Sequence, residues 1–180
     1  MERDMKKILL TEEQICNRVA ELGRELMVDY ADKTPVFVGV LKGVVVFYAD
    51  MIREFPAPCE LDFMWISSYS GTQSTGNMLV RKDVTVDLKG RHVVILEDIL
   101  DTGRSLKFTY DHLVSKGAAS VRICTLLDKP EGRVEGYDIH ADYVGFRIPN
   151  EFVVGYGLDY NEKYRNLPYV GILKPEVYEK

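Results

Sequence analysis

Apolar and branched residues recur along the chain with two periods, and their alternation predicts an α/β protein. Apolar residues return every three or four positions from Ile15 to Leu26, which is the spacing of one helical face. Thr11, with Gln14 three residues later, forms a capping box just before this pattern. The pattern therefore predicts a helix over 11–29.

Short runs rich in branched apolar residues predict strands that are buried on both faces. We predict strands over 36–41, 61–69, 78–84, 92–98, 121–127, 142–146, 152–156 and 169–173. Helices are predicted over 44–55 and over the segment in which Leu106 and Leu113 share a face, ahead of Gly117. The small polar residues of 70–77 predict a loop. Strands that alternate with helices at short spacing imply right-handed crossovers and a mostly parallel sheet.

The composition agrees with one compact folding unit. The chain has 180 residues, of which 46% are hydrophobic and 28% charged, so we predict a single domain over 1–180. A net charge of −5 argues against nucleic-acid binding through phosphate neutralisation. Cys16, Cys59 and Cys124 are widely spaced and form no CxxC pair, so we predict buried thiols in a reducing compartment.

The N-terminal sequence and the most apolar segment argue against export and membrane insertion. MERDMKKILL has too short an apolar run for a signal peptide and lacks a small-residue cleavage site. The segment 36–52 approaches the length of a membrane span, but Lys42, Gly43 and Asp50 interrupt it. A buried strand followed by a helix explains this segment better. We expect a cytoplasmic protein without a membrane partner.

One segment, VVILEDILDTGRS (93–105), combines a strand, three carboxylates and the start of a helix. Ligands of an open parallel sheet bind beyond the carboxyl ends of its strands, where Glu97 and Asp98 are expected. Adjacent acids there can accept hydrogen bonds from paired hydroxyls or bind Mg²⁺. Thr102 to Ser105 offer N–H groups and hydroxyls at a helix N-terminus, a setting that binds phosphate. The segment has neither a Walker nor a GxGxxG pattern, and on composition alone it also fits a strand, a surface turn and a capped helix without a ligand.

The run EDILDTGRS (97–105) resembles the signature with which type I phosphoribosyltransferases bind phosphoribosyl pyrophosphate (PRPP). Leu41-Lys42-Gly43, Lys129 and the run 146–171 are similar to hypoxanthine-guanine phosphoribosyltransferases of the short bacterial form, in order and spacing over nearly the whole chain. The resemblance implies the type I phosphoribosyltransferase fold. That fold has a mostly parallel central sheet flanked by helices, a small hood built from N- and C-terminal segments, and a flexible lid loop.

The resemblance also implies a role for each residue at a matching position. In that family the turn after the first central strand binds pyrophosphate, often through a cis peptide, which falls here at Leu41–Lys42. Asp101 falls on the general base near the purine N7, and Arg165 falls on a basic residue that contacts pyrophosphate. The implied PRPP-binding residues are Lys42, Gly43, Glu97, Asp98, Asp101, Thr102, Gly103, Arg104, Ser105 and Arg165.

The implied base-binding residues are Lys129, Phe152, Val153 and Asp159. Lys129 would donate to the 6-oxo group, Phe152 would stack on the base, and the backbone of Val153 would read the base edge. From their own surroundings alone, Lys129 also fits a surface lysine, and Phe152 and Val153 also fit the core of a strand. The implied ligands of Mg²⁺ are Glu97, Asp98 and Asp159. The implied lid residues are Ser68 and Tyr69.

Together these residues imply a purine-salvage enzyme that depends on Mg²⁺. It would transfer the 5-phosphoribosyl group from PRPP to hypoxanthine or guanine, giving IMP or GMP and pyrophosphate. By the same resemblance we expect a homodimer or homotetramer with small-molecule substrates and no nucleic-acid partner. Two alternatives stay open, namely a xanthine-preferring phosphoribosyltransferase and a non-catalytic regulator of the same fold.

Overall fold

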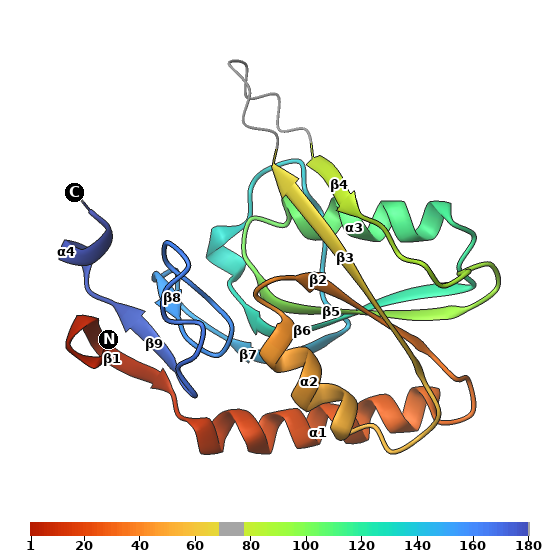
Figure 1. The fold of residues 1–180 in the computed structure, drawn as a ribbon, viewed down its shortest axis with the longest axis horizontal. Helices are drawn as coiled ribbons and strands as arrows, with labels where there is room; N and C mark the ends of the chain where they lie inside the picture. Colours follow the sequence, from red (N-terminus) through yellow and green to blue (C-terminus); the bar gives the residue numbers. More distant parts are fainter. Residues whose placement is uncertain (69–77, 180) are drawn as a thin grey trace.

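A six-stranded sheet forms the centre of the molecule, which we describe from a computed structural model over residues 1–68 and 78–179 (Figure 1). In spatial order its strands are β4 (Met78–Lys82), β3 (Glu60–Ser68), β2 (Val36–Leu41), β5 (His92–Leu100), β6 (Ser120–Asp128) and β7 (Tyr143–Arg147). All neighbours are parallel except β3 and β4, which pair as an antiparallel hairpin. The predicted mostly parallel α/β fold is confirmed.

Helices cover both faces of this sheet (Figure 1). On one face lie α1 (Glu12–Tyr30) and α2 (Val45–Arg53), and on the other lies α3 (Arg104–Ser115). The capping box predicted for the first helix is present, because the Gln14 N–H donates to Thr11 Oγ1 and the Thr11 N–H donates to Gln14 Oε1. Two 3₁₀ turns, η1 (Glu2–Asp4) and η2 (Pro130–Gly132), and a short C-terminal helix, α4 (Pro175–Tyr178), complete the helical elements in these two ranges.

The two cores explain why the central strands carry runs of consecutive apolar residues. Phe37 and Val94 face the side of the sheet that α1 and α2 cover, while Val38 and Ile95 face the side that α3 covers. Alternate side chains of a strand point to opposite faces, so the part of a strand that is covered on both faces is apolar at consecutive positions. The apolar segment 36–52 is accordingly divided between β2 and α2.

A second, three-stranded sheet joins the two ends of the chain and forms the hood (Figure 1). Its antiparallel order is β1 (Met5–Leu10), β9 (Val170–Leu173) and β8 (Val153–Val154). The strand predicted over 152–156 is shorter in the structure because Gly155, Tyr156 and Gly157 adopt positive φ angles, which turn the chain away. The predicted hood of N- and C-terminal segments is confirmed.

The prediction of three buried thiols is wrong for Cys16. This residue is exposed on α1, since it follows the buried Ile15 by one position and so points away from the helix face that packs on the sheet. Cys59 is half-buried and Cys124 is buried. In the two ranges that the structure describes, no helix combines the length and apolar character needed to cross a membrane.

Candidate active site

The carboxyl ends of three neighbouring parallel strands bring the predicted residues together. The strand β2 is followed by Lys42 and Gly43, β5 by Asp101, and β6 by Lys129. Because β5 lies between β2 and β6 in the sheet, these three turns meet at one edge. This is the edge where ligands bind in open parallel sheets.

The Lys42–Gly43 turn is held between an acidic strand end and the C-terminal loop. The Leu41–Lys42 peptide bond is cis, as the resemblance implied. A Cβ atom placed on Gly43 would lie 1.9 Å from Asp98 Oδ2, and one placed on Gly157 would lie 2.0 Å from the Gly43 carbonyl oxygen. Only glycine fits at either position without displacing its neighbour.

Glu97 and Asp98 form a buried pair of carboxylates near the end of β5. Burial raises the pKa of Glu97 well above its ordinary value, and the charge of Asp98 raises it further. Burial also raises the pKa of Asp98. Asp98 Oδ1 accepts a hydrogen bond from the Ile99 N–H at 3.0 Å, whereas Glu97 Oε2 is buried without a hydrogen-bond partner. Such an orphaned oxygen is expected where a ligand completes a site.

This pair fits a magnesium ion. Carboxylate oxygens are the ligands that Mg²⁺ prefers, and it is commonly held by one or two of them together with water and substrate phosphates. In residues 1–68 and 78–179 no three His, Cys, Asp or Glu side chains are gathered in a way that could hold a metal. Asp159, the third predicted ligand, therefore does not join Glu97 and Asp98 in one cluster.

Asp101 and Lys129 form an ion pair at the mouth of the site. Lys129 Nζ lies 2.9 Å from Asp101 Oδ2. The lysine side chain is 11% exposed and the aspartate side chain 41% exposed. A hydrogen-bond donor and a hydrogen-bond acceptor are thus fixed side by side, with the acceptor open to solvent.

The loop from Thr102 to Ser105 opens α3 in a form suited to phosphate. Gly103 is the N-cap residue and has a left-handed backbone (φ 85°), and no side chain caps the helix. The Arg104 N–H makes a long hydrogen bond to Thr102 Oγ1 (3.4 Å), and the following N–H groups of the first turn can bind an anion, which the helix dipole also favours. The Arg104 guanidinium lies over the ring of Tyr137, 5.6 Å from its centre.

A cluster of charges on the C-terminal loop faces the Lys42 turn. Arg165 Nη2 lies 2.8 Å from Asp159 Oδ1, and Arg165 Nη1 donates to the Gly157 carbonyl at 2.7 Å. Glu162 contacts both predicted pyrophosphate cations, at 3.2 Å from Lys42 Nζ and 3.4 Å from Arg165 Nη2. The Lys42 ammonium lowers the pKa of this exposed glutamate. No local pattern in the sequence indicated that Glu162 belongs here.

Phe152 lies at the hood in a small aromatic cluster. Its ring stacks on Tyr178 at a centroid distance of 4.8 Å and meets Tyr160 edge-on at 5.7 Å. Phe152 is 37% exposed and precedes β8, whereas Val153 is buried within that strand. The structure thus leaves part of Phe152 accessible, and the two tyrosines were not predicted from the sequence.

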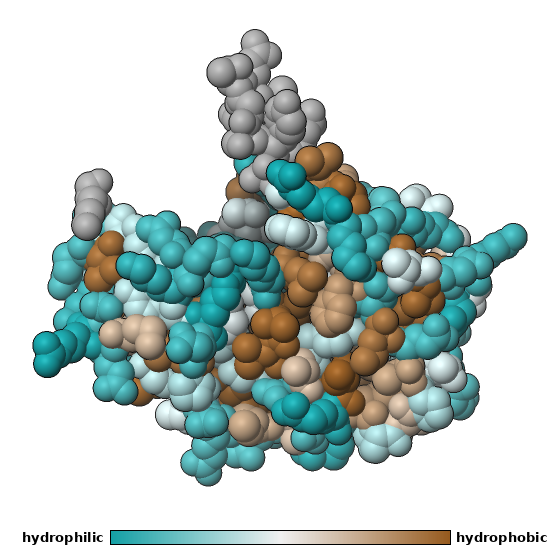
Figure 2. All heavy atoms as spheres, viewed as in Figure 1, coloured by the Kyte–Doolittle hydropathy of each residue, from teal (hydrophilic) through white to brown (hydrophobic). Residues whose placement is uncertain are grey.

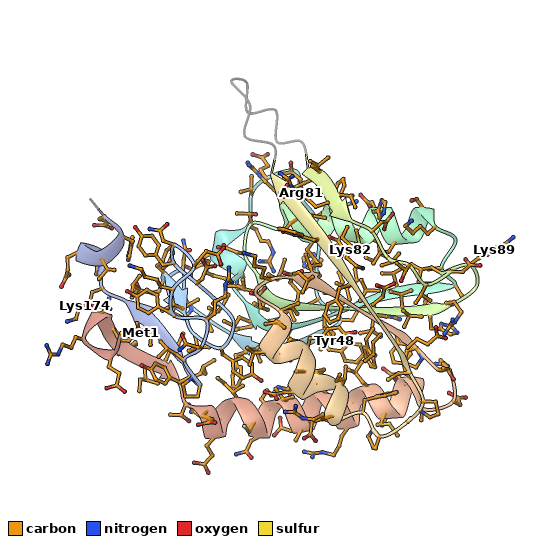
Figure 3. The ribbon with its side chains drawn as sticks, viewed as in Figure 1. Met1, Tyr48, Arg81, Lys82, Lys89 and Lys174 are labelled. Atoms are coloured by element: carbon orange, nitrogen blue, oxygen red, sulfur yellow. The ribbon has the colours of Figure 1, made fainter. Side chains whose placement is uncertain are left out.

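The predicted lid begins where the description of the structure stops. Ser68 is the last residue of β3 and pairs with Met78 of β4, while Tyr69 and the loop 70–77 lie outside the described residues. Near the start of β3, the buried Asp62 anchors the hairpin. It accepts hydrogen bonds from Lys82 Nζ (3.2 Å) and from the Thr85 N–H (2.6 Å). Figure 3 labels Lys82 on this hairpin.

Asp62 is held in its charged form. Burial acts to raise its pKa, but hydrogen bonds from the N–H groups of Val86, Phe63 and Thr85 and from Lys82 outweigh burial and lower the pKa to about 2. The carboxylate is therefore a structural anchor for the two strands that lead into the predicted lid.

Comparisons with known proteins agree with this geometry. The family model described as "Phosphoribosyl transferase domain" matches residues 6–161. The hypoxanthine-guanine phosphoribosyltransferase of Streptococcus pneumoniae is 54% identical over 179 residues, which cover 99% of this chain and 98% of the relative. A crystal structure of a hypoxanthine phosphoribosyltransferase from Staphylococcus aureus superposes with a TM-score of 0.94 at 51% identity, covering 100% of this chain and 97% of the other. The Trypanosoma cruzi hypoxanthine phosphoribosyltransferase, solved with the product IMP, superposes with a TM-score of 0.90 at 40% identity, covering 97% of each chain.

Proposed function

Since the chain belongs to the phosphoribosyltransferase family, we propose that it is a purine-salvage enzyme that transfers the 5-phosphoribosyl group of PRPP to hypoxanthine or guanine. The products are IMP or GMP and pyrophosphate. The names of close relatives support these substrates, as does the IMP bound to the Trypanosoma cruzi relative.

The 2.9 Å pair of Lys129 Nζ and Asp101 Oδ2 carries this proposal. An oxopurine presents its O6 and N7 atoms next to each other on one edge. Lys129 can donate to O6 while Asp101 accepts the proton carried by N7. Adenine has an amino donor in place of O6, which would oppose the lysine. The pair therefore favours 6-oxopurines.

The transfer step follows from this placement. The N9 lone pair of the base attacks the ribose C1′ as the bond from C1′ to the pyrophosphate oxygen breaks, and Asp101 takes the proton that N7 gives up. Phe152 stacks on the base, and the Val153 backbone and Asp159 read its far edge. Pyrophosphate leaves with the bonding electron pair.

The rest of the site holds PRPP. Glu97 and Asp98 accept hydrogen bonds from the ribose hydroxyls, and Thr102, Gly103, Arg104 and Ser105 bind the 5′-phosphate at the start of α3. Lys42, Gly43 and Arg165 bind pyrophosphate, for which the planar fork of arginine is suited. When bound at Glu97 and Asp98, Mg²⁺ supplies positive charge against the pyrophosphate. Ser68 and Tyr69 close over the reaction centre and exclude water.

We also propose that the chain is one domain that assembles with copies of itself in the cytoplasm. One apolar cluster, which includes Leu10, Leu96 and Ile172, contains residues of both sheets, and this supports one domain. Figure 2 shows apolar side chains gathered on the face formed by α2 and β3, and the exposed apolar residues there include Leu61 and Trp65. A patch of this kind supports a homodimer or homotetramer. Three free cysteines suit a reducing compartment.

A panel of bases tests the function. Pyrophosphate release from PRPP with Mg²⁺ is measured with hypoxanthine, guanine, xanthine and adenine. Fast turnover with the first two and slow turnover with adenine is the expected result. Preference for xanthine would reassign the substrate, and no turnover with any base would favour a regulator of the same fold.

A further inference from the structure

The side chain of Arg133 ties together the two loops that carry Asp101 and Lys129. Arg133 Nη1 contacts three backbone carbonyl oxygens, those of Leu100 (2.7 Å), Asp101 (2.8 Å) and Lys129 (3.1 Å). Its other terminal nitrogen, Nη2, donates to the carboxylate of Asp128. The side chain is 22% exposed, so these bonds form largely out of water.

These contacts begin where the pairing of the sheet ends. The last paired residues of β5 and β6 are Leu100 and Asp128, and one more bond follows from the Lys129 N–H to the Leu100 carbonyl at 3.0 Å. Beyond this point the strands separate into two loops. The guanidinium of Arg133 hydrogen-bonds to the carbonyl oxygens of Asp101 and Lys129, the first residues of these two loops. It therefore links the two loops where backbone hydrogen bonds no longer do.

The turn before Arg133 is fitted to the same pair. A Cβ atom on Gly132 would lie 2.0 Å from Asp101 Oδ1 and 3.0 Å from Lys129 Cε. The Gly132 N–H donates to the Lys129 carbonyl at 2.9 Å, which folds η2 back over the ion pair. The absence of a side chain at Gly132 thus lets Asp101 and Lys129 approach each other below this turn.

A simpler role for Arg133 is to neutralise the buried Asp128. That role does not require the three carbonyl contacts, and Asp128 has a second cation nearby, since Arg147 Nε lies 3.8 Å from Asp128 Oδ2. Arg147 is 80% exposed and contacts Asp128 from the solvent side. The two arginines therefore share the charge compensation of Asp128, whereas Arg133 also contacts the carbonyl oxygens of the two loops.

We propose that Arg133 is a positioning residue that sets the spacing of Asp101 and Lys129 to match the N7 and O6 atoms of an oxopurine. The inference rests on the proposed function. Arginine suits the role because its planar fork reaches the carbonyl group and the carboxylate at the same time, whereas lysine offers one nitrogen. Displacement of a reacting group by about 1 Å can lower the rate by about 100-fold.

The test compares Arg133→Met and Arg133→Lys with the matched control Arg147→Met. For Arg133→Met we expect kcat/KM for hypoxanthine to fall by about 10- to 100-fold, while the KM for PRPP stays within about threefold. The preference for hypoxanthine over adenine should fall as well, which a loss of stability alone would not cause. Arg133→Lys should recover only part of the loss, and Arg147→Met should behave as the wild type.

The double variant Asp128→Asn/Arg133→Met removes the buried charge that the single variant leaves with only the exposed Arg147, at 3.8 Å. It is measured if Arg133→Met does not fold. Wild-type base kinetics in either methionine variant of Arg133 would overturn the inference, as would an equal loss in hypoxanthine and PRPP kinetics. Failure of the double variant to fold, with normal base kinetics in Arg133→Lys, would also overturn it. Wild-type protein without transferase activity would instead overturn the proposed function.

Discussion

Replacement of Asp101 by asparagine should separate proton transfer from substrate binding. Asparagine has the same shape and keeps an oxygen for Lys129 Nζ, which lies 2.9 Å from Asp101 Oδ2 in the wild type. The amide oxygen cannot take the N7 proton at neutral pH. A positioned general base contributes about 10²- to 10⁴-fold, so kcat should fall by that factor, or by about 3 to 5 kcal/mol in the barrier.

Stability and PRPP affinity should change little in this variant. Asp101 is 41% exposed, and an ion pair with such a partner contributes about 1 kcal/mol or less. Single-turnover rates at saturating PRPP and hypoxanthine measure the chemical step, and calorimetry measures PRPP binding. Glu131→Gln, which removes an exposed acid two positions after Lys129, is the matched control and should react at the wild-type rate. A wild-type rate for Asp101→Asn, or a loss of PRPP binding as large as in Glu97→Gln/Asp98→Asn, would refute the assignment of the base.

Three further substitutions probe the contact to the base, the anchor of the β3–β4 hairpin and the predicted pyrophosphate cations. Lys129→Gln should reduce kcat/KM for hypoxanthine by about 10- to 100-fold and weaken discrimination against adenine, and unchanged kinetics would remove the lysine from the site. Asp62→Asn should lower the free energy of unfolding at pH 7 by about 2 kcal/mol. Because the pKa of Asp62 is lowered in the folded state, the difference in unfolding free energy between wild type and variant should be present above about pH 4 and shrink as the pH falls toward 2. Denaturant titrations at several pH values measure this difference, and a difference that stays constant with pH would contradict the prediction. Glu162→Gln should lower the inhibition constant of pyrophosphate by about two- to fivefold, because the glutamate carboxylate no longer competes with pyrophosphate for Lys42 and Arg165. An unchanged inhibition constant would contradict that competition.

Local patterns were sufficient to predict the elements that form the central sheet. The strand over 36–41 has the predicted bounds, and the first helix begins at the predicted capping box. In contrast, β1 was not predicted, because Lys6 and Lys7 interrupt its apolar pattern and its pairing partner β9 lies at the other end of the chain. A strand that is stabilised by such a distant partner leaves a weak local signal.

The candidate site likewise contains residues that the sequence predicts and residues that it does not. Asp101 and Lys129 follow strands, and Glu97 and Asp98 lie near the end of one. Parallel strands place their carboxyl ends together, so the proximity of these residues could be expected from the sequence. Arg133 and Glu162 act through contacts with the backbone and with side chains of other loops. Neither belongs to a periodic pattern. Their roles depend on the turns that carry them, which is why only the three-dimensional structure relates them to the site.

The hood sheet depends on a strand that is translated after all the strands of the central sheet. Its middle strand, β9, pairs with β1 on one side and with β8 on the other, so the sheet cannot close before residues 170–173 have been translated. The central sheet, whose strands end at Arg147, requires none of those residues for its own pairing. A nascent chain can thus assemble its PRPP-binding loops while the β8 strand, which carries Val153, still lacks its neighbour. The strand pairing that supports Val153 in the hood therefore forms only after residues 170–173 have been translated, later than the pairing of the central sheet.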